Sequence, residues 1–299
     1  MTRIAIFATA ALVGLTTAAS AETVSVQTYP GPAEVPARPE TTIVYDLAAL
    51  DTLDALGVTG LTSISNTYLD YLADYTGDAG TLFEPDFEAV NAAQPDLVIV
   101  GGRSQPHLDA MAGIAPAIDM TIWGADVVEQ GLARLEAYGQ IWGRQDEAAA
   151  LKAEVEQSIA DTRTAAEGKG SALILLTNGP KISVYGSGSR FGWLHDLTGL
   201  TEAAGGLDAE THGEAVSFEY VRDIDPDWLL VVDRVAAIGG EGENARATLD
   251  NALIRETSAW QSGQVIYLDA GPIYIAGGGV QSTLMTLDTL RAGLEGADG

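Results

Sequence analysis

Three arginines follow segments that the sequence predicts to be strands or turns. Arg103 directly follows LVIVGG, Arg234 directly follows LLVVD, and Arg190 follows the turn-rich YGSGS. Ligands of open α/β sheets bind beyond the carboxyl ends of the strands, so these side chains can face one site. A guanidinium group stays charged and offers a planar set of donors, which suits an anionic ligand rich in oxygen. A solvated arginine, or one paired with a local carboxylate, is the alternative at each single position.

Two of these arginines end matching segments of the chain. Residues 87–103 read FEAVNAAQPDLVIVGGR and residues 218–234 read FEYVRDIDPDWLLVVDR, with seven identities in seventeen positions and no gap. Each copy predicts a helix that starts next to Glu88 or Glu219, a Pro-Asp break and an apolar strand. Two distant copies indicate two similar lobes, since a stacked repeat array needs more copies at a shorter period. If the lobes face each other, Arg103 and Arg234 both project into the cleft between them.

Composition limits the possible functions. The chain of 299 residues has 42 acidic and 15 basic side chains and a net charge of −27, which argues against binding to nucleic acid or to an anionic membrane. Residues 1–21 have the pattern of a signal peptide cleaved after Ala21, and the absence of cysteine excludes both disulfides and a lipid-anchored cysteine. We therefore expect a periplasmic protein, with secretion to the medium as the alternative. An acidic or salty habitat can by itself explain the charge.

The pattern of elements predicts an α/β fold. Strand and helix signals alternate from residue 42 to 122, with a polar, aromatic loop after residue 65, and alternate again from residue 171. Between these regions, helical periodicity predicts helices at 126–142 and 145–167. We expect two α/β lobes with mainly parallel sheets joined by one long bridging helix. The predicted division is 22–143 for the N-terminal lobe, 144–168 for the bridging helix and 169–299 for the C-terminal lobe.

Further predicted elements lie in the second region. They are strands at 171–179, 181–186 and 265–269, and helices that begin near Gly192 and cover 244–257 and 280–294. Residues 22–41 are expected to form an extended lead-in.

Several segments together resemble one family. They are YGSGSRFGWLHDLTGL (185–200), THGEAVSFEYVRDIDPDWLLVVDR (211–234), LDNALI (249–254), VIYLDAGPIYIAGGG (265–279) and the first repeat copy. The chain resembles the class III periplasmic binding proteins that deliver ferric siderophores to ATP-binding-cassette (ABC) importers, in particular the branch that binds catecholate siderophores such as enterobactin fragments. The resemblance implies two α/β lobes bridged by a long helix, which agrees with the pattern of elements.

The resemblance also implies roles for single residues. Arg103, Arg190 and Arg234 correspond to arginines that surround the anionic iron–catecholate complex. His212 in THGEAVS and Tyr274 in IYIAGGG correspond to a histidine and a tyrosine that coordinate Fe(III) when the siderophore supplies only four oxygens. Fe(III) is a hard ion that favours phenolate, accepts imidazole and prefers six ligands. The iron thus arrives with the ligand, and no intrinsic cofactor is expected.

The resemblance further implies that the matching glutamates, Glu88 and Glu219, meet arginine pockets on the membrane permease, with Glu84 and Glu214 as near alternatives. Stabilisation of the helix dipole explains Glu88 and Glu219 equally well at this stage. A monomer without enzymatic activity is expected. His212 can instead hold a loop, and Tyr274 can be a packed aromatic, although the glycines after it favour exposure.

Other residues and functions are weaker candidates. His107 can sit at the rim of the cleft, and His195 on a predicted helix is expected to be structural. The same fold with haem, cobalamin or a hydroxamate siderophore as cargo is the alternative function, although three arginines count against a neutral hydroxamate. An exported hydrolase lacks support, because GSGSR is not the strand–elbow–helix serine motif. A zinc receptor is disfavoured by only three histidines and no cysteine.

Overall fold

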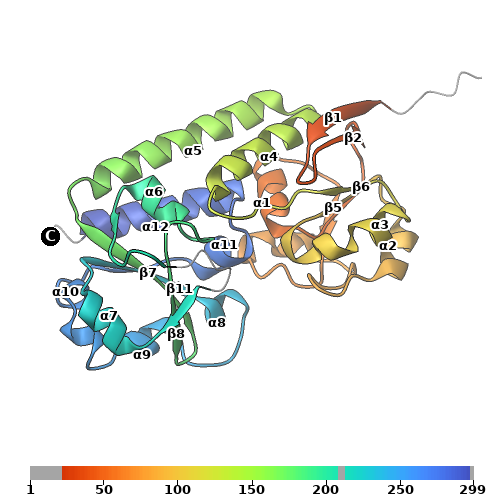
Figure 1. The fold of residues 1–299 in the computed structure, drawn as a ribbon. Coiled ribbons are helices and arrows are strands. Elements are labelled where there is room, and N and C mark those ends of the chain that lie inside the picture. Colours follow the sequence, from red (N-terminus) through yellow and green to blue (C-terminus); the bar gives the residue numbers. More distant parts are fainter. Residues whose placement is uncertain (1–21, 208–212, 297–299) are drawn as a thin grey trace, which may run out of the picture.

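The computed structural model describes residues 22–207 and 213–296 (Figure 1). The predicted signal peptide, residues 1–21, lies outside the described residues, and so does His212. The chain opens with β1 (Thr23–Gln27) and β2 (Pro32–Pro36), which pair antiparallel. The predicted extended lead-in is therefore a hairpin.

The first lobe is built on a parallel sheet. Its strands are β3 (Thr42–Val44), β4 (Leu61–Ser63), β5 (Leu97–Val100) and β6 (Ala117–Asp119), in the order β4-β3-β5-β6. Every residue of β3 and β5 is buried, as expected of parallel strands covered on both faces. Around the sheet lie helices α1 (Leu47–Ala55), α2 (Phe87–Ala93) and α3 (Leu108–Ala112), and the 3-10 helices η1 (Asp70–Tyr75) and η2 (Gly102–His107).

The second lobe is built on a mixed sheet of order β10-β8-β7-β11-β12, with β9 also paired to β7. The pairs β7–β8 and β8–β10 are antiparallel, and the pairs of β7 with β11 and of β11 with β12 are parallel. The strands are β7 (Ser171–Asn178), β8 (Lys181–Tyr185), β9 (Thr201–Glu202), β10 (Glu214–Val216), β11 (Trp228–Asp233) and β12 (Val265–Tyr267).

Short helices surround this second sheet. They are α6 (Trp193–Thr198), α7 (Phe218–Ile224), α8 (Arg234–Ala237), α9 (Ala245–Leu249), η3 (Ile254–Glu256), α10 (Ser258–Gln261) and α11 (Ala270–Ile275). The prediction of one helix over 244–257 is wrong, because α9 ends at Leu249. The side chain of Asn251 accepts the backbone N–H groups of Leu253 and Ile254, which replaces the continued helix by a turn.

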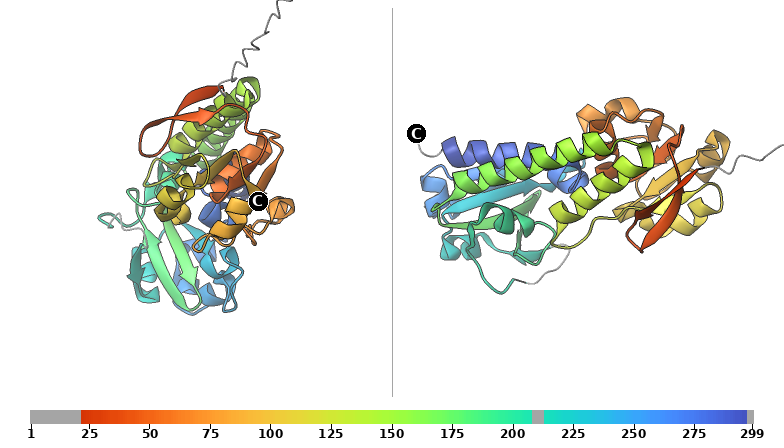
Figure 2. Two further views of the ribbon diagram at one scale, coloured as in Figure 1. Left: turned by 90° about the vertical axis from the view of Figure 1, so that its right-hand side faces the viewer. Right: turned by 90° about the horizontal axis from the view of Figure 1, so that it is seen from above.

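Long helices join the lobes. Helix α4 (Val127–Trp142) ends at Gly143, whose left-handed φ of 67° closes the helix, and α5 (Gln145–Ala166) begins directly after it. The predicted bridging helix is α5, which spans one side of both lobes in Figure 1. The C-terminal helix α12 (Val280–Gly296) packs against α5 and also reaches α1 in the first lobe. Seen from above in Figure 2, α5 and α12 run side by side.

A buried carboxylate ties the start of α12 to the first lobe. Asp51 of α1 is 0% exposed and accepts the backbone N–H groups of Gln281 and Ser282 at 2.8 and 2.9 Å. It also accepts the hydroxyl groups of Ser282 and Tyr71 at 2.8 and 2.6 Å. Two backbone amides at a helix N-terminus favour a negative charge, but the loss of water raises the pKa of Asp51 to about 6. The carboxylate is thus an integral part of the junction.

Candidate functional site

The three predicted arginines converge on one tyrosine. Arg103 Nη2 and Arg190 Nη2 both donate to the carbonyl oxygen of Tyr274, at 3.2 and 3.0 Å. Arg234 Nε donates to the hydroxyl oxygen of the same tyrosine at 3.1 Å. These side chains come from η2 after β5, from the loop after β8, from α8 and from α11. Both lobes therefore contribute cations to one point, as expected if the matching strand ends face each other.

Aromatic rings hold the central guanidinium group. The Cζ atom of Arg190 lies 4.7 Å from the centre of the Phe191 ring and 4.6 Å from that of Tyr274. Arg103 Cζ lies 5.5 Å from the Tyr274 ring. Burial lowers the pKa of Arg190, and the charge of Arg103 lowers it further. The guanidinium groups of Arg103 and Arg190 donate to the same carbonyl oxygen and repel each other, so an anion placed between them is stabilised.

The arginines of the site differ in their ion pairing from other arginines of the chain. Over residues 22–207 and 213–296, none of the three arginines forms an ion pair, whereas Arg222, Arg255 and Arg291 do. Loss of water raises the pKa of the half-buried Asp46 carboxyl beside Gly101, and the nearby charge of Arg103 lowers this pKa by less. In a chain of net charge −27, such a concentration of positive charge is a marked local exception.

A cavity of about 600 Å³ adjoins this group in the second lobe. Arg190, Arg234 and Tyr274 line it, together with Tyr185 and Lys181. Burial raises the pKa of Tyr185 to about 12, so this phenol stays protonated at neutral pH and can donate a hydrogen bond. Glu219 also borders this cavity, which sequence reasoning did not anticipate. The cavity combines cations, phenols and apolar surface, a lining suited to an aromatic, anionic ligand.

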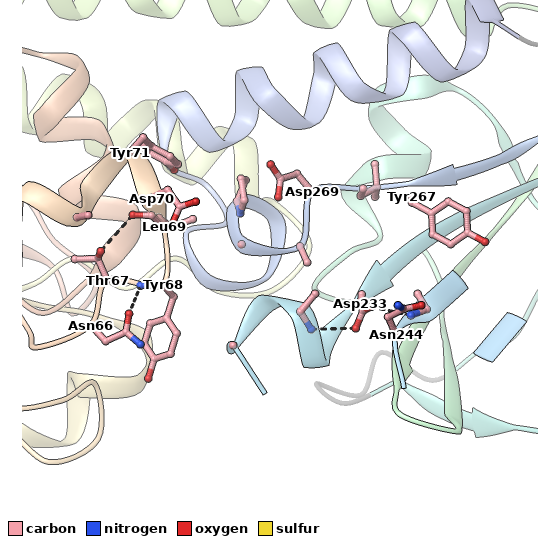
Figure 3. A pocket seen from close by; sticks show the side chains of 18 of the residues that line it. Asn66, Thr67, Tyr68, Leu69, Asp70, Tyr71, Asp233, Asn244, Tyr267 and Asp269 are labelled. Atoms are coloured by element: carbon pink, nitrogen blue, oxygen red, sulfur yellow. Dashed lines mark hydrogen bonds between the residues drawn. The ribbon is translucent and has the colours of Figure 1, made fainter. Parts of the chain in front are cut away.

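A second cavity, of about 790 Å³, opens between the lobes and is drawn in Figure 3. Its lining joins residues 65–76 of the first lobe to residues after β11 and β12 of the second. Asp70 and Asp269 lie on facing sides of it in Figure 3, and Tyr68 and Tyr267 also line it. Sequence reasoning missed this cavity; the polar, aromatic loop after residue 65 was its signal. None of the three arginines lines it, so the cationic group belongs to the other cavity.

The remaining predicted residues lie away from the cationic group. His107 contacts Phe87 and Phe83: its Nε2 atom is 3.0 Å from the Phe83 carbonyl oxygen, and its ring centre is 6.1 Å from that of Phe87. His195 is buried, with Nδ1 at 3.2 Å from the carbonyl oxygen of Leu200, and burial lowers its pKa. Both contacts are structural.

The candidate glutamates are all exposed. Glu88 and Glu219 lie in the first turns of α2 and α7, Glu84 in the turn before α2, and Glu214 at the start of β10. The glycines after Tyr274, taken as a sign of exposure, instead allow close packing: a Cβ atom on Gly278 would press on Ile122, and one on Gly131 of α4 would overlap the backbone of Gly278. Tyr274 itself is half-buried.

The described residues form neither a metal-binding cluster of protein side chains nor a membrane-spanning helix. In the residues that the structure describes, no group of three or more histidine, aspartate or glutamate side chains is placed to hold a metal ion. Among the same residues, each helix is too short or too polar to cross a membrane.

Comparison with known proteins places the chain in a family. A model described as "Periplasmic binding protein" matches residues 42–272. The petrobactin-binding protein YclQ of Bacillus subtilis is 35% identical over 269 residues, which cover 88% of this chain and 84% of that protein. The crystal structure of YclQ superposes with a TM-score of 0.83 and covers 92% of this chain and 99% of its own.

Two further relatives extend the comparison. The ferric-anguibactin-binding protein FatB of Vibrio anguillarum is 27% identical over 271 residues, which cover 86% of this chain and 83% of that protein. The periplasmic catecholate-siderophore-binding protein VctP of Vibrio cholerae superposes with a TM-score of 0.83 at 29% identity, covering 91% of this chain and 100% of its own. These structures share the class III architecture of two α/β lobes and a long helix. The chain belongs to the periplasmic binding protein family.

Proposed function

We propose that this protein captures a ferric catecholate siderophore between its lobes and delivers it to an ABC import permease. The observation that carries the proposal is the convergence of Arg103, Arg190 and Arg234 on Tyr274 from both lobes. The names of YclQ, FatB and VctP, which bind petrobactin, ferric anguibactin and catecholate siderophores, support the same class of ligand.

The chemistry of the site favours an anionic iron complex. Catecholate oxygens bound to Fe(III) carry negative charge and can accept from guanidinium forks, while catechol rings can stack on the same planar groups. The donors that now serve the two oxygens of Tyr274 are those that a ligand oxygen would engage. A neutral hydroxamate complex gains much less from three positive charges, so we place hydroxamate cargo second.

Tyr274 and His212 are the proposed protein ligands of the iron when the siderophore supplies four oxygens. A phenolate and an imidazole are both acceptable to Fe(III) and would fill the two open positions. The iron is cargo in this proposal and not a resident cofactor.

The remaining parts of the proposal concern the route of the protein. We infer that residues 1–21 direct export and are removed after Ala21, and that the mature protein works as a periplasmic monomer without enzymatic activity. We further infer that Glu88 and Glu219 dock on the permease, one from each lobe. Both are exposed near helix starts, as such contacts require.

The double variant Arg103→Ala/Arg234→Ala tests the binding site. It should lose measurable binding of ferric bis-catecholate in tryptophan-quench titrations while its circular dichroism stays that of the wild type. Arg255→Ala is the matched control, because Arg255 is exposed, pairs with Asp250 and does not line the cavity beside Tyr274. Unchanged titration of the double variant would refute the assignment.

A further inference from the structure

The segment 83–88, with the sequence FEPDFE, presents two apolar rings to solvent. Phe83 is 63% exposed and Phe87 is 37% exposed, which makes them two of the four strongly exposed large apolar side chains among the described residues. The side chains of Glu84, Asp86 and Glu88 are also exposed. We call these six residues the FEPDFE patch. It combines apolar surface with three carboxylates in one short stretch.

The patch is held in an ordered turn. Thr81 N–H donates to the Glu84 carbonyl oxygen at 2.9 Å, and Glu84 N–H donates to the Thr81 hydroxyl oxygen at 3.0 Å. The side chain of Asp86 accepts the Ala89 N–H and caps α2. His107 reaches both the backbone of Phe83 and the ring of Phe87. A partner that covers these rings therefore pays little conformational entropy to order them.

The matching position of the second lobe is arranged differently. Phe218, which corresponds to Phe87 in the repeat, is only partly buried but packs against the apolar core of its lobe. Its neighbour Glu219 borders the arginine-lined cavity. In the second lobe the repeated helix thus forms with its first ring, Phe218, packed inward. The exposure of Phe87 is therefore particular to the first lobe.

We propose that the FEPDFE patch is the apolar anchor by which the first lobe docks on the permease. The partner surface would be an apolar pocket for Phe83 and Phe87, bordered by basic side chains that meet Glu84, Asp86 and Glu88. This inference rests on the proposed function and adds a difference between the lobes. The first lobe docks through rings and charge, and the second through charge, so the protein sits on the transporter in one preferred orientation.

General features of protein interfaces support the permease as the partner of this patch. Aromatic side chains that enter pockets supply much of the binding energy of an interface and mainly slow dissociation, whereas rim charges mainly speed association. The three carboxylates select a basic partner and oppose contact with anionic lipid. The two rings and the carboxylates of Glu84 and Glu88 lie in one short segment, so one partner can cover the apolar and the charged groups together.

The test measures docking on the purified permease of the same transport system, reconstituted in nanodiscs, with surface plasmon resonance. The variant Phe83→Ser/Phe87→Ser should lose at least about tenfold in affinity, mainly through faster dissociation, with an unchanged dependence on salt. Glu219→Gln should instead slow association and weaken the salt dependence. The double variant Tyr29→Ser/Trp123→Ser is the matched control, because those rings are 50% and 55% exposed outside the patch.

Wild-type docking of Phe83→Ser/Phe87→Ser would overturn the proposal, and so would an equal loss in the control, which would indicate unspecific adhesion. Phe87→Leu keeps an apolar side chain and should retain most of the affinity. Siderophore titration of the Phe83→Ser/Phe87→Ser variant separates the two proposals, because neither ring lines the arginine-lined cavity. Loss of docking with unchanged binding of ferric bis-catecholate supports the anchor, while a wild-type protein that binds no ferric catecholate refutes the proposed function and leaves the docking result to stand by itself.

Discussion

The two lobes share a helix–strand unit but contribute unequally to the cationic group. The first lobe supplies Arg103 at the end of β5, and the second supplies Arg234 at the end of β11 together with Arg190 and Tyr274. The second lobe also forms the cavity next to these side chains. The first lobe instead exposes the FEPDFE patch. A unit of the same construction thus serves mainly ligand binding in one lobe and, in our proposal, mainly docking in the other.

The two copies share the helix ends and aspartate contacts that position their strands, which we call the shared frame. Gln94 and Asp225 end the repeated helices with left-handed φ angles of 47° and 49°. The aspartates that follow, Asp96 and Asp227, each bind the start of the neighbouring strand: Asp96 accepts from Thr41, and Asp227 accepts from Ser171. The frame positions the strand end, and the residues beyond that end are free to differ.

The largest expected effect tests the inequality of the lobes in ligand binding. Arg190→Ala/Arg234→Ala should weaken binding of ferric bis-catecholate by about 100-fold or more, and Arg103→Ala by about tenfold, since a hydrogen bond to a charged group contributes about 1.5–3 kcal/mol. Quench titrations at constant salt measure both. Arg222→Ala, which removes a half-buried arginine paired with Asp223, should bind as the wild type. Equal losses of affinity in Arg190→Ala/Arg234→Ala and in Arg103→Ala would contradict an unequal contribution of the two lobes to ligand binding.

The next effect tests how the lobes are tied together. Asp51 has a pKa of about 6 in the folded protein, above its usual 3.8, because it is buried. The folded state therefore binds this proton more tightly than the unfolded state between pH 4 and 6. The contribution of this carboxyl to the free energy of unfolding is then fully present below about pH 4 and falls as the pH rises to about 6.

Asp51→Asn removes this titration and leaves at least one of the N–H groups of Gln281 and Ser282 facing an amide donor. We expect the variant to unfold more easily, and its deficit in free energy of unfolding to be about 2 kcal/mol larger at pH 4.5 than at pH 7.5. Urea denaturation followed by circular dichroism measures this. Thr164→Ala, an exposed change on α5, is the control. A deficit that is constant with pH, or larger at pH 7.5, would show that Asp51 does not titrate in this way.

Much of the fold could be predicted from the sequence because the signals were local. The repeat, the helix periodicity before and after Gly143, and the apolar strands all depend on neighbouring residues. The class III fold, predicted from this pattern and from the family resemblance, is confirmed by the structure and by YclQ and VctP. The prediction of one helix over 244–257 was wrong because the side chain of Asn251 accepts two backbone N–H groups, those of Leu253 and Ile254, and so competes with the helix.

The site was predictable in its residues and not in its contacts. Strand ends located Arg103 and Arg234, but their meeting at Tyr274 depends on the angle between the lobes. That angle follows from packing between distant parts of the chain, such as Gly131 on Gly278 and Asp51 on the start of α12. For the same reason the sequence did not predict the interlobe cavity. The place of Glu219 was missed because it depends on packing within the second lobe, whose residues line the cavity beside it. The roles of Arg103, Arg190, Arg234, His212 and Tyr274 stay predictions.

The smallest effect tests the shared frame itself. Asp96 accepts backbone N–H groups of Glu40 and Thr41 at 3.0 and 2.9 Å, and these bonds lower its pKa. Asp227 accepts the N–H of Ser171 at 2.7 Å. Asp96→Ala and Asp227→Ala should each lower the free energy of unfolding by about 1 kcal/mol, because both bonds are exposed to water.

Equal losses in urea denaturation would indicate that the repeat preserves one mechanical role in both lobes, with Asp223→Ala, outside the frame, as the control. If only Asp227→Ala lowers the free energy of unfolding, the two copies share a sequence pattern but the two aspartates do not contribute equally to stability. Siderophore affinity should change less than threefold in both variants, since neither aspartate contacts an arginine of the site. A larger change in Asp227→Ala alone would mean that the frame of the second lobe also sets the position of Arg234, and the division between frame and site would then hold for the first lobe only.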